Sequence, residues 1–198
     1  MPHLVCQKEV AYYMRRMYRQ RLTTSLGGNI SLLVEPFLYI TPSQTDKASL
    51  LAKHVCVYHT EDKNLSLGQS LSMESGMHLA IYGQQTKAKA VIHAHPPYAT
   101  SFTVAHQLID TRLTTEAWEL IGQIIAVPYA APGTDKLAQW VADASLKASV
   151  ILLENHGIVA WGATLSEAFR RIELIEHTAC IQLASNLLGK THRIPDQI

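Results

Sequence analysis

The sequence is poor in cysteine, in excess charge and in long apolar runs. Its three cysteines lie far apart and form no Cys-x-x-Cys motif, which argues against a disulfide framework and favours a reducing compartment. The formal net charge of +1 gives no general electrostatic attraction to nucleic acid. No apolar run reaches the length of a membrane span, and the first residues lack the apolar core of a secretory signal. We therefore expect a cytoplasmic protein that binds neither nucleic acid nor membrane.

What the sequence does contain is typical of a globular domain. Hydrophobic residues make up 47% and charged residues 17% of 198 residues, enough to bury a substantial core. No repeat, low-complexity tract or linker divides the chain, so residues 1–198 are expected to form a single domain. Apolar periodicity and turn residues predict helices near 5–22, 72–82, 98–107, 112–122, 134–147 and 164–189, a turn at 61–64, and strands near 32–34, 37–40, 54–60, 91–95, 124–129, 150–154 and 158–161.

Two histidines two residues apart, His93 and His95, end one of these strands. Alternate residues of a strand project from one face, so both imidazoles could hold one metal ion. A His-x-His pair is a weak signal in a chain with ten histidines. Catalytic zinc sites commonly combine three protein ligands with one open position. The best candidate for the third ligand is His156, in the tight Asn-His-Gly turn that follows an apolar strand.

Two loops contain residues that could bind an anion. Gly27 and Gly28, which stand beside small hydroxyl residues and Asn29, could let the backbone present several N–H groups to an anion, although such a pair is more often only a turn. Ser43 follows a strand directly, in Thr41-Pro42-Ser43, where its hydroxyl could also be turn chemistry. On the residues alone, both interpretations remain open for each loop.

One acid stands out from the others. Ser72 is predicted to be the N-cap of a helix that places Glu74 on the same face as the core residue Met77. A carboxylate that faces inward near the start of a helix is costly unless it is paired or bound to a metal. Glu74 is therefore the strongest candidate for a catalytic acid, whereas His78, one turn further along, fits packing as well as chemistry.

An anion loop, an inward acid and three histidines suit one kind of chemistry. A metal ion with an open position polarises a carbonyl, and the acid moves a proton. The anion loop would hold a phosphorylated substrate at a fixed distance from the metal. This combination favours carbon–carbon cleavage or isomerisation next to a sugar ketone.

The sequence resembles the class II aldolase/adducin family over nearly its whole length, from about Lys8 to Gly189. Several separated motifs occur in the family's order, which is far more specific than any one of them. They are Gly27-Gly28-Asn29-Ile30-Ser31, Ile40-Thr41-Pro42-Ser43, Ser72-Met73-Glu74, Val91-Ile92-His93-Ala94-His95, residues 128–134 (PYAAPGT) and Asn155-His156-Gly157.

The resemblance implies a three-layer α/β/α fold on a largely antiparallel sheet. It also implies a homo-oligomer, usually a tetramer, with active sites between subunits. His93, His95 and His156 match the ligands of one catalytic Zn²⁺ per subunit. Glu74 matches the family's acid/base, which also touches the metal before substrate arrives.

The resemblance further implies a phosphorylated sugar as substrate, held at the positions that match Gly28, Asn29, Ser43 and Ser72. Two departures concern the ends of that substrate. Met73 stands where the family has a second serine, which removes one phosphate-binding hydroxyl. The family's second proton donor is a tyrosine from a neighbouring subunit, and residues 115–118 (TEAW), with Glu119 just beyond, contain none. Glu116 or Glu119 could replace it.

These features predict a zinc-dependent aldolase that cleaves L-fuculose 1-phosphate or a related deoxy-ketose 1-phosphate into dihydroxyacetone phosphate and an aldehyde. Three alternatives remain. A methylthioribulose-1-phosphate dehydratase also uses three histidines and a glutamate, and resembles the segment 156–162. A ribulose-5-phosphate 4-epimerase shares the metal site but has aspartate in place of Glu74. A non-enzymatic adducin-like interaction module keeps the fold but loses the histidines.

Overall fold

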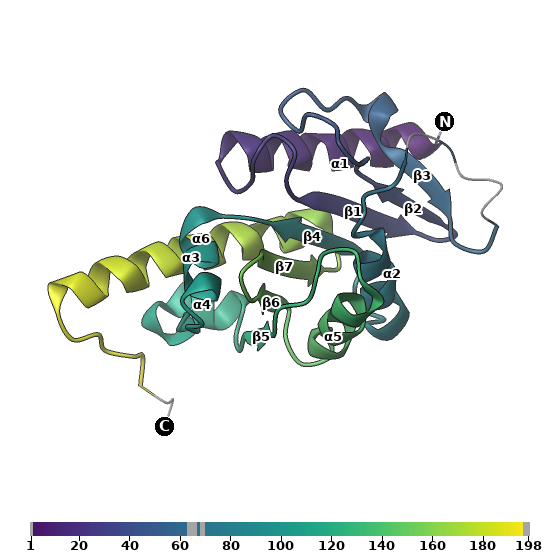
Figure 1. Ribbon diagram of the computed structural model, residues 1–198. Helices are drawn as coiled ribbons and strands as arrows, with labels where there is room; N and C mark the ends of the chain where they lie inside the picture. Colours follow the sequence, from purple (N-terminus) through teal and green to yellow (C-terminus); the bar gives the residue numbers. More distant parts are fainter. Residues whose placement is uncertain (1, 63–66, 68–69, 196–198) are drawn as a thin grey trace.

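A mixed sheet of seven strands forms the centre of the computed structural model, which describes residues 2–62, 67 and 70–195 (Figure 1). The strand order is β3-β2-β1-β4-β7-β6-β5. Neighbouring strands are antiparallel except β5 and β6, which pair in parallel. The strands are β1 (Asn29–Val34), β2 (Phe37–Ile40), β3 (Cys56–His59), β4 (Ala90–Ala94), β5 (Ile125–Val127), β6 (Val150–Leu153) and β7 (Gly157–Gly162).

Helices cover both faces of this sheet. One hydrophobic cluster joins the sheet to α1, α3, α4 and α6, and a second joins its other face to α2 and α5. The expected three-layer α/β/α arrangement is therefore confirmed. The helices are α1 (Pro2–Arg19), α2 (Ser75–Gln84), α3 (Pro97–Val104), α4 (Thr115–Leu120), α5 (Asp135–Ser145) and α6 (Leu165–Leu188), with short 3₁₀ turns η1 (Ala52–His54) and η3 (Thr111–Leu113).

The middle strand β4 is buried on both faces, and its alternation decides where the histidines point. Ile92 packs in the cluster that contains Phe169 of α6. Val91 packs in the cluster that contains Met77 of α2. Because successive side chains of a strand point to opposite faces, His93 lies on the same face as Val91 and hence toward α2.

The predicted elements are present, but several of their boundaries differ. The first helix ends at Arg19, because Arg21 takes a left-handed φ of 59° and the N–H of Leu22 bonds to Met17 O. The expected helix at 112–122 is split, since Thr114 is extended and caps α4 through its hydroxyl. Residues 63 and 64 of the expected turn lie outside the described residues.

The predicted N-cap role of Ser72 is wrong. Helix α2 begins at Ser75, and its N-cap position is occupied by Glu74. Ser72 instead accepts a hydrogen bond from the backbone N–H of Glu74 through its hydroxyl, at 3.3 Å. The helix starts later because Glu74 keeps a non-helical backbone, with φ −97° and ψ 12°. The hydroxyl therefore positions the acid itself and leaves the helix without a side-chain cap.

The described helices include none that is both long and apolar enough to span a bilayer.

Gly157 brings the β6–β7 turn against the end of β4. The turn holds Asn155 at a left-handed φ of 54°, and the N–H of His156 bonds to Leu153 O at 3.1 Å. A Cβ added at Gly157 would lie 2.5 Å from Ala94 O and 2.6 Å from a ring carbon of His95. Only glycine therefore permits the approach that sets His156 beside His95.

We expect Gly157→Ala to lower the free energy of unfolding by about 1–3 kcal/mol, because the new methyl group would force the strand ends apart. The matched control is Gly76→Ala in α2, where an added Cβ meets nothing within 4 Å. Denaturant unfolding of both variants checks this expectation. Equal stability of the two variants would show that the strand ends do not need the close approach.

Candidate metal centre

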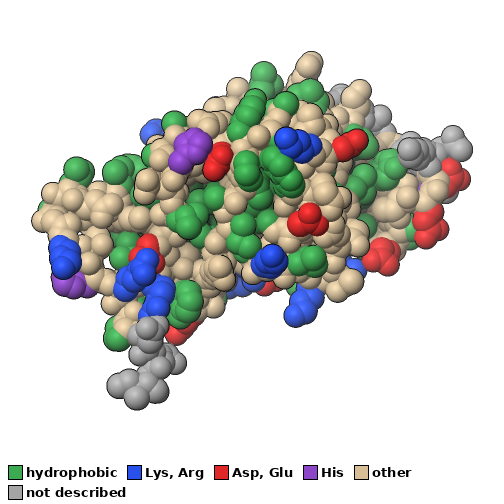
Figure 2. All heavy atoms as spheres, turned by 60° about the horizontal axis from the view of Figure 1, so that its bottom comes forward, with side chains coloured by type: hydrophobic (Ala, Val, Ile, Leu, Met, Phe, Trp, Pro, Cys, Tyr) green, Lys and Arg blue, Asp and Glu red, His purple; other side chains and the backbone are tan. Residues whose placement is uncertain are grey.

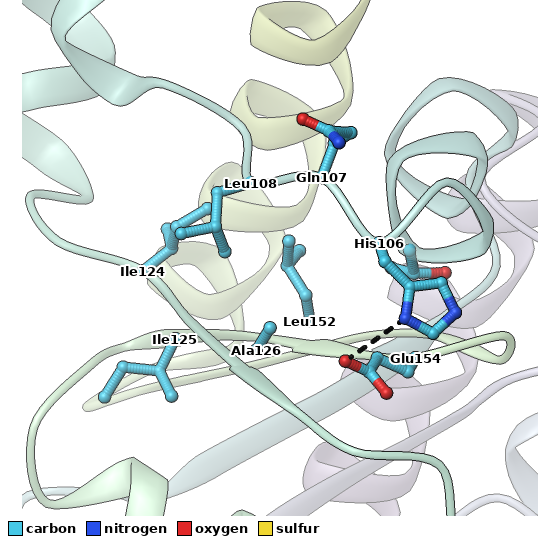
Figure 3. A pocket seen from close by; sticks show the side chains of 9 residues that line it. His106, Gln107, Leu108, Ile124, Ile125, Ala126, Leu152 and Glu154 are labelled. Carbon is cyan, nitrogen blue, oxygen red and sulfur yellow. Dashed lines mark ion pairs between the residues drawn. The ribbon is translucent and has the colours of Figure 1, made fainter.

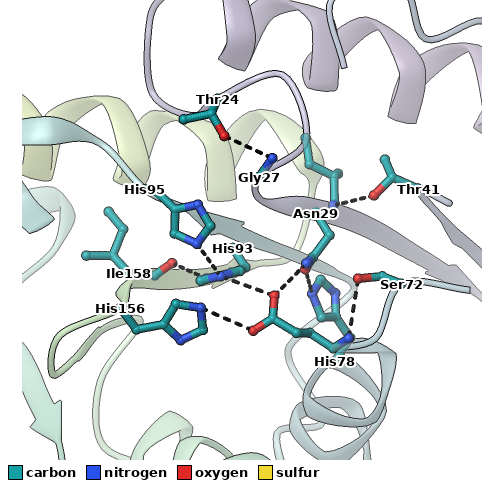
Figure 4. A network of polar contacts seen from close by, with 12 residues as sticks. Thr24, Gly27, Asn29, Thr41, Ser72, His78, His93, His95, His156 and Ile158 are labelled. Atoms are coloured by element: carbon teal, nitrogen blue, oxygen red, sulfur yellow. Dashed lines mark hydrogen bonds and ion pairs between the residues drawn. The ribbon is translucent and has the colours of Figure 1, made fainter. Parts of the chain in front are cut away.

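Three histidines from two chain segments converge at the end of β4 (Figure 4). His93 lies on β4, His95 follows the strand directly, and His156 comes from the β6–β7 turn. One ring nitrogen from each lies within 4.8 Å of the others, and the Nε2 atoms of His93 and His95 are 2.9 Å apart. Ligand nitrogens about 2.0–2.1 Å from a tetrahedral ion stand about 3.3 Å apart. The three imidazoles therefore fit around one metal ion.

Glu74 faces the same three histidines from the start of α2. Its Oε2 lies 3.3 Å from His93 Nε2, and its Oε1 lies 3.5 Å from His156 Nε2. The side chain is buried, and among the described residues Oε1 has no hydrogen-bond partner. A buried carboxylate oxygen without a partner is costly, and a cation would remove that cost. Three imidazoles and a carboxylate are a donor set that suits a divalent transition metal.

Burial keeps two of the imidazoles neutral. It lowers the pKa of His93 to about 3, assisted by the positive charge that His156 can carry. It likewise lowers the pKa of His95 to about 3, assisted by His93 and His156. Nδ1 of His93 lies 3.0 Å from the carbonyl oxygen of Ile158 and donates to it, so the lone pair of Nε2 is directed at the cluster. Neutral imidazoles with this tautomer are ready to bind a metal without first losing a proton.

A cavity of about 330 Å³ opens beside the histidines. Its wall brings together the residues that the sequence suggested for substrate and metal binding, from five separate segments. Of the predicted site residues, Gly28, Asn29, Ser43, Ser72, Glu74, His95 and His156 line it. His93 lies behind His95 and is fully buried.

The glycine loop is held tightly against β4. Gly28 has a left-handed φ of 67°, and an added Cβ would lie 2.8 Å from His93 O. The hydroxyl of Thr24 accepts a hydrogen bond from the N–H of Gly27 at 3.1 Å. The glycines therefore allow the loop to pack closely against β4, and they also line the cavity.

Asn29 uses its side chain in a way that the sequence did not indicate. Its Nδ2 donates to Glu74 Oε2 at 2.9 Å, and its Oδ1 lies 2.5 Å from His78 Nε2. The amide thus bridges the acid and a buried histidine. His78 was noted in the sequence without a role, because helical spacing alone does not distinguish a packed histidine from a hydrogen-bonded one.

Lys47 is a cavity residue that sequence reasoning missed. It lies within a polar stretch that suggests an exposed loop, yet it is only 2% exposed. Its ammonium donates to Pro42 O at 2.9 Å, and burial lowers its pKa. Among the described residues that line the 330 Å³ cavity, it is the single lysine or arginine. Only burial in the folded chain reveals it.

A second cavity, of about 370 Å³, lies at the β5 edge of the sheet (Figure 3). Leu108, Ile124 and Leu152 contribute to a largely apolar lining. His106 Nδ1 lies 3.6 Å from Glu154 Oε1 at its rim. Figure 2 shows the face of the molecule that lies at the bottom of Figure 1, and hydrophobic side chains gather near the middle of this face. The second cavity contains none of the predicted site residues.

Comparisons with known proteins agree with this geometry. The family model described as Class II Aldolase and Adducin N-terminal domain matches residues 8–183. A protein named L-fuculose phosphate aldolase from Methanococcus vannielii is 34% identical over 172 residues, which cover 87% of this chain and 92% of that protein. A protein named 3-oxo-tetronate 4-phosphate decarboxylase from Haemophilus influenzae is 30% identical over 182 residues, covering 88% of this chain and 86% of that protein.

Solved structures are also similar to this chain. The crystal structure of YgbL from Escherichia coli, described as a putative aldolase/epimerase/decarboxylase, superposes with a TM-score of 0.89 and 25% sequence identity. The superposition covers 98% of this chain and 96% of that chain.

We expect elemental analysis to find about one divalent transition-metal ion per chain, and His95→Ala to lose it, since two imidazoles would remain. His177→Ala, a change on an exposed face of α6, is the matched control and should retain the metal. Wild-type protein that contains no metal, and takes up none on addition, would contradict the site.

Proposed function

Because the chain belongs to the class II aldolase and adducin family, we propose that it is a zinc-dependent aldolase acting on a ketose 1-phosphate. The products would be dihydroxyacetone phosphate and an aldehyde, and L-fuculose 1-phosphate or a related deoxy-ketose 1-phosphate would be the substrate. The convergence of Glu74 with three histidines beside one cavity is the observation that carries this proposal.

The reaction breaks a carbon–carbon bond next to a ketone. A zinc ion held by His93, His95 and His156 would polarise the oxygens of the ketone and its neighbouring hydroxyl when substrate is bound. As the bond breaks, the carbon that remains on the three-carbon fragment must receive a proton. Glu74 is the carboxyl that faces the histidines, and we assign it the role of carrying that proton.

The phosphate would bind at the end of the cavity formed by the glycine loop. Gly28 and Asn29 at this loop and the hydroxyls of Ser43 and Ser72 are neutral groups that line it. Lys47 would add a positive charge close to them. Hydrogen bonds to ionised groups contribute more than neutral ones, so a buried lysine would strengthen the binding of a phosphate dianion.

A second candidate reaction is decarboxylation of a 3-oxo-acid phosphate, such as 3-oxo-tetronate 4-phosphate. Aldol cleavage needs a second group, which removes the proton from the hydroxyl that becomes the aldehyde. Residues 115–118, where the family resemblance locates a tyrosine for this step, read TEAW. Loss of carbon dioxide leaves the same three-carbon fragment but requires no such group, so Glu74 alone would suffice. The relative from Haemophilus influenzae carries the name of this activity.

We further propose a homotetramer in the cytoplasm. The family resemblance supports this assembly, and so does the apolar character of the β5 edge, where Leu108 and Trp118 are exposed. Cys6 and Cys180 form no disulfide, in keeping with a reducing compartment.

The products of the metal-loaded enzyme test the proposal. Candidate substrates are L-fuculose 1-phosphate, other deoxy-ketose 1-phosphates and 3-oxo-tetronate 4-phosphate, and mass spectrometry separates the outcomes. Dihydroxyacetone phosphate with an aldehyde supports the aldolase, and dihydroxyacetone phosphate with carbon dioxide supports the decarboxylase. Loss of water would indicate a dehydratase, and an isomer of unchanged mass an epimerase. No turnover of any of these by metal-loaded protein would favour an interaction module.

In the same assay, we expect Glu74→Gln to lower kcat by about 100-fold or more, because proton transfer by a positioned acid contributes about 10²–10⁴-fold. Metal content should stay close to that of the wild type, since three imidazoles remain. Glu9→Gln, an exposed carboxylate on α1, is the matched control. Full activity of Glu74→Gln would rule out this assignment of the proton carrier.

We expect Lys47→Met to raise KM by about 10- to 100-fold with a small change in kcat, because one charge-assisted hydrogen bond contributes about 1.5–3 kcal/mol. Methionine keeps the length of the side chain, which limits repacking. Steady-state kinetics and inhibition by inorganic phosphate are the measurements, with the exposed Lys53→Met as control. An unchanged KM together with lower thermal stability would assign Lys47 a structural role through its bond to Pro42.

A further inference from the structure

Behind Glu74, polar side chains from β1 and α2 form a largely buried row, and Figure 4 shows its part at Asn29 and His78. Asn29 and Ser31 lie two residues apart on β1 and therefore share one face. Glu74, His78 and Tyr82 follow each other at intervals of four residues, so they share one face from the start of α2 onward. The two faces meet, and their side chains interleave.

Four contacts join this row end to end. They run from Tyr82 Oη to Ser31 Oγ (2.8 Å), from Ser31 Oγ to His78 Nδ1 (2.6 Å), from His78 Nε2 to Asn29 Oδ1 (2.5 Å), and from Asn29 Nδ2 to Glu74 Oε2 (2.9 Å). Ser31 and His78 are fully buried, and Asn29 is 3% exposed. Water therefore has little access to the row between its two ends.

The hydrogen-bonding capacity of each group identifies the donor in the three contacts between Ser31 and Glu74. An ionised carboxylate only accepts hydrogen bonds, so the amide nitrogen of Asn29 must face Glu74. Its oxygen then faces His78 and needs a donor, which is the N–H at Nε2. Burial lowers the pKa of His78 to about 3, so the ring is neutral at neutral pH and carries one hydrogen. Nδ1 consequently accepts from the hydroxyl of Ser31. From Ser31 onward, each donor in the row points toward Glu74.

We infer that His78 is a positioning residue that fixes the orientation of the Asn29 amide and, through it, the carboxylate of Glu74. This inference rests on the proposed function of Glu74 as the proton carrier. Without the donor at His78 Nε2, the buried Oδ1 of Asn29 loses its partner, and the amide is held only by its bond to Glu74 Oε2. The amide and the carboxylate that it contacts could then shift together away from their positions in the site.

The row reaches the cavity only at its Glu74 and Asn29 end. Both residues line the cavity, whereas Ser31, His78 and Tyr82 do not. Met77 and Ile81 of the same helix pack in an apolar cluster against the sheet. Buried polar groups in such a layer are costly unless each has a hydrogen-bond partner, and the side chains of Asn29, Ser31 and His78 all have partners. That arrangement holds the acid in place from behind while leaving its free oxygen, Oε1, facing the histidines.

The first test compares two replacements of His78 in the zinc-loaded enzyme. His78→Leu removes the donor and should lower kcat by about 10- to 100-fold with little change in KM or zinc content, because displacement of a reacting group is costly to the rate. His78→Gln retains an N–H near the position of Nε2 and should recover much of the loss. Ile81→Ala, a buried change on the same helix, controls for lost stability and should leave kcat close to the wild-type value. A kcat of His78→Leu within twofold of the wild type would overturn the inference.

A double variant tests whether His78 acts through Glu74. In the Glu74→Gln background, His78→Leu should cause no further loss of kcat, because the group that His78 positions is already absent. If the two losses multiply, His78 influences the reaction independently of Glu74, and the positioning role is wrong.

A third measurement needs no substrate. Nitrogen NMR of zinc-loaded protein labelled with ¹⁵N should find the ring proton of His78 on Nε2, and His78→Leu should shift the side-chain amide signals of Asn29. A ring proton on Nδ1 would overturn the inference whatever the activity. The expected spectrum in a protein that turns over no sugar phosphate would instead refute the proposed function and leave the positioning of Glu74 intact.

Discussion

The carboxylate of Glu74 is withdrawn from water, and the surrounding groups are those that a buried carboxylate requires. Asn29 donates to one oxygen from β1, while the other oxygen faces the ring of His156 without a hydrogen bond. A divalent cation among the three histidines would complete this arrangement. Burial also keeps the rings of His93 and His95 neutral, which is the form that binds a metal ion.

The order of the strands makes this arrangement possible. In the sheet, β4 lies between β1 and β7 (Figure 1). The loop before β1, the end of β4 and the turn before β7 therefore lie side by side, although they are distant in the chain. Gly28 allows the loop before β1 to approach β4 from one side. Gly157 allows the turn before β7 to approach it from the other. The histidine cluster is thus a consequence of how closely three antiparallel strands meet.

The site has two parts, and only one of them matches the residues typical of the family. The histidines, the acid and the glycine loop match the family, and together they suit any reaction that leaves a proton-accepting carbon next to a phosphorylated ketone. The part that would handle the leaving group is different, because residues 115–118 offer no tyrosine. Relatives are named as aldolases and as decarboxylases, two reactions that differ in the group that leaves. We therefore expect the specificity of this chain to depend on its less typical half.

Local features of the sequence determined much of the fold and the identity of the candidate ligands. The spacing of His93 and His95 on a strand, the turn around His156 and the cap of α5 at Thr134 depend only on residues a few positions apart. Tertiary structure alone decided the burial of Lys47 and the bridge from His78 to Glu74. In that bridge, the two partners of Asn29 lie 45 and 49 positions away, at separations where periodicity contains no information. A polar side chain takes its role from the groups buried with it, and burial is a property of the folded chain.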